Sequence, residues 1–107
     1  MARVLLVCVA GVSGTFLAQR MRAVDPDLEP VVTPIDALGA VLGEAVLLAP
    51  QLADRTEAVR TLVAPTPVGL LPAAAFGAAG AQAAVAQARE LLATAAYRGI
   101  PTIETKE

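Results

Sequence analysis

Histidine and tryptophan are absent from this chain of 107 residues, and cysteine occurs once, at Cys8. The absence of histidine excludes Ser–His and Cys–His catalysis and any metal site built on imidazole. A single cysteine can form neither an internal disulfide nor a CxxC redox pair, and it is typical of a protein from a reducing compartment. Few side chains with chemical reactivity remain, and Cys8 stands out among them.

Clusters of like charge and long apolar runs are also lacking in the sequence. The eight Lys and Arg residues are scattered and give a net charge of −2 with the ten Asp and Glu, so no nucleic-acid-binding surface is expected. Although the mean hydropathy is +0.64, every apolar run is interrupted before the roughly 18 residues of a membrane span. Residues 2–19 also lack the pattern of a signal peptide. We therefore expect a soluble, cytoplasmic protein without direct membrane insertion, forming one domain over residues 1–107 with a flexible tail from about residue 100.

Strand-like and helix-like segments alternate along the chain. Strands are predicted at residues 3–8, 30–35, 45–49 and 67–70, and helices at 15–24, 51–62 and 81–98. This alternation predicts an α/β fold in which helices cover both faces of a parallel sheet. Pro34 places the second strand at an edge of the sheet, because proline offers no N–H for pairing. In the first helix, the apolar positions at near-helical spacing are Phe16, Leu17, Met21 and Val24.

The segment CVAGVSGT, residues 8–15, joins the first strand to the first helix. Ligands of open parallel sheets bind outside the carboxyl ends of the strands, where Cys8 is expected. The small residues let successive N–H groups converge on an anion, the helix start adds its positive dipole, and Ser13 and Thr15 add hydroxyl donors. The same field favours a nucleophilic thiolate at Cys8. The alternative is that Cys8 is an inert, small hydrophobic residue of the core.

Comparison with known phosphate-binding motifs narrows the kinds of phosphate site that residues 8–15 could form. The GxxxxGK[ST] motif of P-loop NTPases and the GxGxxG motif of dinucleotide-binding folds are both absent. A cysteine phosphatase needs an arginine six residues after its nucleophile to clamp the phosphoryl oxygens, and that position is Gly14. We therefore expect a site that holds a phosphoryl group better than it hydrolyses one.

Two stretches resemble a known family. CVAGVSGTFLAQRM, at residues 8–21, is similar to the active-site loop of the IIB components of the bacterial phosphoenolpyruvate-dependent sugar phosphotransferase system, in the lactose/cellobiose-specific class. AVLLAPQLAD, at 45–54, is similar to the third-strand segment of that class, and the resemblance spans roughly residues 3–95. The fold it implies is an open four-stranded parallel sheet in the order 2-1-3-4 with helices on both faces, resembling the arrangement of low-molecular-weight tyrosine phosphatases.

The resemblance implies an enzyme, a protein-phosphocysteine–sugar phosphotransferase. Cys8 would accept a phosphoryl group from a histidine of a IIA partner and pass it to a lactose- or cellobiose-like disaccharide or β-glucoside bound by the membrane permease IIC. The phosphate would be held, chiefly by backbone N–H groups, in a loop formed by Val9, Ala10, Gly11, Val12, Ser13, Gly14 and Thr15. No cofactor and no metal are implied. The absence of histidine agrees with a donor imidazole that belongs to another protein.

Five residues in and around these stretches are noted separately. Gly14 stands where the family usually has threonine, and Asp54 stands where a tyrosine is common. Pro50 and Gln51 either line the site beside Cys8 or only end a strand and start a helix. Asp36 either faces the cleft or caps the N-terminus of a short helix.

Three functions remain open from the sequence. The first is the phosphoryl carrier of a sugar phosphotransferase system. The alternative is a phosphate- or anion-binding regulatory module of phosphatase-like fold without turnover. The third is a structural or regulatory partner in which Cys8 is an inert core residue.

Overall fold

The computed structural model describes residues 2–8, 12–40, 42–77 and 80–98. Within these ranges the chain forms the predicted α/β fold, with four parallel strands in the order β2-β1-β3-β4. The strands are β1 (Ala2–Cys8), β2 (Leu28–Pro34), β3 (Ala45–Leu48) and β4 (Val68–Leu70). The α-helices are α1 (Val12–Val24), α2 (Thr56–Val63) and α3 (Gly80–Arg98), and the 3-10 helices are η1 (Ile35–Ala40), η2 (Pro50–Arg55) and η3 (Ala73–Phe76).

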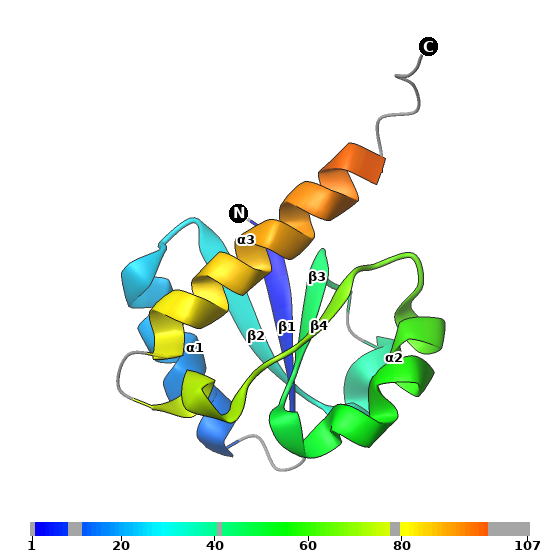
Figure 1. Cartoon of the computed structure of the whole chain (residues 1–107), viewed down its shortest axis with the longest axis horizontal. Coiled ribbons are helices and arrows are strands. Elements are labelled where there is room, and N and C mark those ends of the chain that lie inside the picture. Colours follow the sequence, from blue (N-terminus) through cyan, green and yellow to red (C-terminus); the bar gives the residue numbers. More distant parts are fainter. Residues whose placement is uncertain (1, 9–11, 41, 78–79, 99–107) are drawn as a thin grey trace.

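Helices cover both faces of the sheet, as predicted. On one face, Leu17 and Met21 of α1 and Val85 of α3 pack into a buried cluster with side chains of β1 and β3. On the other face, η1, η2 and α2 cover a second cluster, to which α2 contributes Val59. Figure 1 shows α3 crossing diagonally in front of the sheet. The central strands β1 and β3 are therefore buried on both sides, which explains why their sequences are continuously apolar.

The two edge strands, β2 and β4, are partly protected from further pairing. Pro34 lies in β2 at the edge of the sheet, as predicted, and Pro30 is a second position in that strand without an N–H. The Pro30 carbonyl accepts a hydrogen bond of 2.9 Å from Nη2 of Arg22. At the opposite edge, the Leu70 carbonyl accepts one of 2.9 Å from Nε2 of Gln87. These contacts use polar groups that an exposed strand edge would otherwise offer to another chain.

The prediction of a helix over residues 51–62 is wrong in its first half. Residues 50–55 form the tighter 3-10 helix η2, and α2 begins only at Thr56. Leu52, inside η2, has a non-helical backbone conformation with φ −104° and ψ 19°, and its side chain is buried against the sheet. We infer that burial of Leu52, combined with Pro50 two residues after the end of β3, sets this kinked start.

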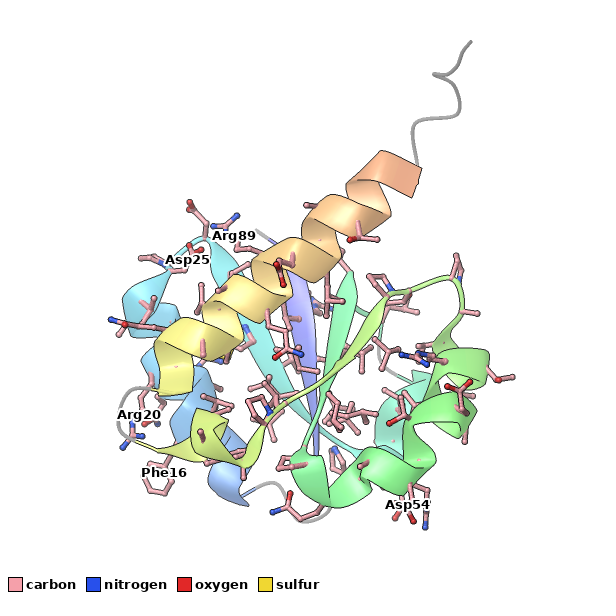
Figure 2. All side chains as sticks on the ribbon, in the orientation of Figure 1. Phe16, Arg20, Asp25, Asp54 and Arg89 are labelled. Atoms are coloured by element: carbon pink, nitrogen blue, oxygen red, sulfur yellow. The ribbon has the colours of Figure 1, made fainter. Side chains whose placement is uncertain are left out.

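An ion pair ties the turn after α1 to α3. Nε of Arg89 donates to Oδ2 of Asp25 at 2.7 Å, and Nη2 of Arg89 donates to the same oxygen. Figure 2 shows the two side chains meeting at the end of the molecule remote from Phe16 and Asp54. The hydrogen bonds from Arg89 lower the pKa of Asp25, with a smaller contribution from the backbone N–H of Asp27.

We expect Asp25→Asn to lower the melting temperature at neutral pH but not in strong acid. A folded-state pKa below the unfolded-state value contributes stability that is present above the unfolded-state pKa and is lost as the pH falls through the folded-state pKa. Thermal melts of the wild type and the variant, from neutral pH to strong acid, measure the difference in melting temperature. Asp36→Asn removes an exposed carboxylate and serves as the control. A difference between wild type and Asp25→Asn that is unchanged in strong acid would show that the carboxylate charge is not responsible.

Candidate functional site

Cys8 is the last residue of the central strand β1, at the carboxyl edge of the sheet. Its Cα partner on β2 is Pro34, and on the other side the Ala49 amide donates to the Val7 carbonyl at 2.9 Å. Cys8 is only 8% exposed. A strand buried on both faces therefore carries the one thiol of the chain to the edge at which open parallel sheets bind ligands.

The first turn of α1 lies directly against this thiol. A Cβ placed on Gly14 would lie 3.4 Å from Sγ of Cys8 and 3.2 Å from Cγ1 of Val32. The first N–H groups of an α-helix have no acceptor within the helix, and they carry its positive dipole end. The structure thus brings Cys8 and Gly14, two of the predicted site residues, into direct proximity.

The start of α1 differs from the sequence prediction. The helix begins at Val12, whereas the pattern predicted a loop through Gly14 and a helix from about Thr15. Val12, Ser13, Gly14 and Thr15 are consequently the first-turn residues of the helix, and Thr15 is exposed. Valine, serine, glycine and threonine are weak helix formers, so propensity alone indicated a loop, but packing of Leu17 and Met21 against the sheet stabilises the helix. Val9, Ala10 and Gly11, also predicted to bind phosphate, lie outside the described residues.

Pro50 and Gln51 follow β3, the strand next to β1. Pro50 is the first residue of η2, so the prediction of a strand end followed by a helix start is confirmed. Pro50 is partly buried and Gln51 is exposed. Because β1 and β3 are parallel neighbours, both residues lie at the same edge as Cys8. Their contact with a ligand remains a prediction.

The two acidic residues singled out in the sequence are both exposed. Asp36 is the second residue of η1, which begins at Ile35, so the prediction that Asp36 is its N-cap is wrong. Backbone pairing of β2 ends at Pro34, and the 3-10 turn follows at once. Asp54 lies in η2, and Figure 2 shows it at the end of the molecule that also holds Phe16, on the opposite side.

The first turn of α1 carries no acidic side chain that would repel an anion. It also carries no basic one, since residues 12–15 are Val, Ser, Gly and Thr. Arg20, about two turns after the start of α1, donates from Nη1 to the Gly77 carbonyl at 3.2 Å. Any anion at this helix start would therefore be bound by backbone N–H groups and hydroxyls, without an arginine clamp in that turn.

Val32 lies next to the site and is not among the residues predicted from the sequence. Cγ1 of Val32, on β2, is the atom nearest to a Cβ added at Gly14. Val32 pairs with Leu6, two residues before Cys8 in the strand register. No local signal identifies this valine, because the contact depends on how α1 crosses β2.

Comparison of the sequence with protein-family models matches none of them, and no curated protein matches it either. Within the described ranges, no group of three or more His, Cys, Asp or Glu side chains could hold a metal ion. None of the helices in the part of the chain described here is both long and apolar enough to cross a membrane.

Proposed function

We propose that this protein is a phosphoryl carrier of the IIB type, acting in a sugar phosphotransferase system. The observation that supports it most is the proximity of the first turn of α1 to Sγ of Cys8 at the carboxyl end of β1, which would lie 3.4 Å from a Cβ added to Gly14. The fold expected from the family resemblance is present, with strands in the order β2-β1-β3-β4. The CVAGVSGT motif supplies the remaining support.

The proposed chemistry comprises two transfers at one sulfur. The Cys8 thiolate attacks the phosphorus of a phosphohistidine on a IIA protein; an S–P bond forms, the P–N bond breaks, and the imidazole nitrogen leaves with the electron pair. A hydroxyl of the sugar held by IIC then attacks the same phosphorus. An O–P bond forms, the S–P bond breaks, the thiolate is restored and the hydroxyl proton passes to water or a base. Backbone N–H groups of the helix start would stabilise the phosphoryl oxygens in both steps.

The proposal is tested by labelling the protein from phosphoenolpyruvate through the general phosphotransferase proteins and a panel of lactose- and cellobiose-class IIA proteins. Each IIA is first shown to label a known IIB protein in the same mixture. Phosphoramidate, a small P–N phosphoryl donor, is the partner-independent arm. We expect stoichiometric label from at least one donor. If none of these competent donors labels the folded protein, the carrier function is wrong.

A second candidate function is phosphate or anion binding without turnover, in a regulatory module. The observation that favours it is the burial of Cys8, which is only 8% exposed, beneath the first turn of α1. In that case, phosphate would change the melting temperature of the wild type while no donor labelled Cys8.

We expect no phosphatase activity above background. A phosphatase stabilises its transition state with a bidentate arginine, and Gly14 stands at that position. Hydrolysis of p-nitrophenyl phosphate by the wild type should equal that by Cys8→Ala. Turnover that disappears in the Cys8→Ala variant would instead assign the chain to the hydrolases.

A further inference from the structure

Gly14 is unusual for a residue in the first turn of a helix. Its backbone does not lie in the left-handed region that favours glycine, so its conformation is open to residues with a side chain. Glycine is also among the poorest helix formers. Neither the backbone conformation nor helix stability therefore explains a glycine at this position.

The space around position 14 explains why it holds a glycine. The three atoms nearest to an added Cβ would be Cγ1 of Val32 at 3.2 Å, Sγ of Cys8 at 3.4 Å and Cγ2 of Val32 at 3.6 Å. The first of these distances is tighter than ordinary carbon–carbon contact. A side chain at position 14 would thus press α1 away from β2 and from the thiol, unless Val32 yielded.

We propose that Gly14 is a positioning residue whose missing side chain lets the start of α1 approach Cys8 closely enough to activate its thiol. The inference rests on the proposed function, in which Cys8 is the nucleophile, and it concerns how that nucleophile is tuned. The N–H groups and dipole of a helix start favour an anion nearby, and their effect falls off within one turn. A shift of the first turn away from Sγ therefore weakens the stabilisation of the thiolate. Val32 matters only when position 14 carries a side chain, because its two methyl groups would lie 3.2 and 3.6 Å from an added Cβ.

The experiment compares Gly14→Ala, Val32→Ala and the double variant Gly14→Ala/Val32→Ala. Gly39→Ala is the matched control, because an added Cβ at Gly39 would meet no atom within 4 Å. The readout is the rate of Cys8 alkylation by iodoacetamide as a function of pH. Circular dichroism confirms that each variant is folded, so that an effect on reactivity is separated from unfolding.

We expect Gly14→Ala to be alkylated more slowly at neutral pH, by up to about fivefold, with the midpoint of its pH profile moved upward, since the whole stabilisation of a nearby anion by a helix terminus is typically of that size. The double variant should recover the wild-type rate and midpoint, because the closest obstructing methyl group is removed. Gly39→Ala and Val32→Ala should keep the wild-type midpoint. A folded Gly14→Ala protein with the wild-type profile, or a double variant that is not rescued, would overturn the proposal.

This result does not depend on phosphoryl transfer. Alkylation needs no partner protein, so the wild type could fail to accept phosphate while Gly14→Ala still shows the altered profile. That outcome would overturn the carrier function and leave the positioning role intact. The reverse outcome, normal labelling with an unchanged alkylation profile in Gly14→Ala, would overturn the positioning role alone.

Discussion

Replacing Cys8 by serine or alanine is expected to reduce phosphoryl acceptance at least about 10³-fold, because the nucleophile is lost or replaced by an un-ionised hydroxyl. Cys8 ends β1, and the strand core formed by Val4, Leu5, Leu6 and Val7 is untouched by either substitution. The variants should therefore fold normally. The measurement is the initial rate of labelling from the donor that works best with the wild type.

Gln19→Ala is the matched control for this experiment. Gln19 is an exposed residue of α1, so its removal should leave the labelling rate within about twofold of the wild type, as surface substitutions are usually mild. Equal labelling of wild type and Cys8→Ser would show that another residue accepts the phosphoryl group.

Met21→Ala is expected to cost about 2–5 kcal/mol of unfolding free energy, as large-to-small substitutions in cores do. Met21 of α1 is 0% exposed and lies in the cluster between α1, α3 and the sheet. Phe16→Ala removes a larger side chain from the same helix, yet Phe16 is 62% exposed. Its loss should change the unfolding free energy by no more than about 0.5 kcal/mol.

Urea unfolding followed by circular dichroism measures both free energies under one set of conditions. Comparing the two variants separates the effect of burial from that of side-chain size, because loss of the smaller, buried side chain should lower the unfolding free energy more than loss of the larger, exposed one. If Phe16→Ala were the more destabilising variant, α1 would have to present a different face to the sheet.

The sequence predicted the fold because its signals were strong and local. Continuous apolar runs at β1 and β3 indicated strands buried on both faces, and Pro34 indicated an edge strand. The buried face of α1 was only half predicted, since Phe16 and Leu17 are adjacent and cannot both face the sheet. The structure buries Leu17 and exposes Phe16 and Val24.

The candidate site was harder to predict, because its geometry depends on contacts between elements distant in the sequence. Cys8 and the small residues that follow it could be recognised as a strand–helix junction. The start of α1 at Val12 could not be recognised from the sequence, because packing overrides the weak helix propensity of residues 12–15. The approach of Gly14 to Val32 depends on the crossing of α1 over β2, and a single sequence contains no record of that crossing.

The proposed carrier function depends on covalent phosphorylation of Cys8. Tandem mass spectrometry of the protein, after reaction with phosphorylated IIA or phosphoramidate, locates the added phosphoryl group. We expect a single phosphoryl group on the sulfur of Cys8, which is lost when the acceptor sugar and IIC-containing membranes are added. A phosphoryl group on any other residue, or an unmodified Cys8 with a donor that labels a known IIB protein, would contradict it.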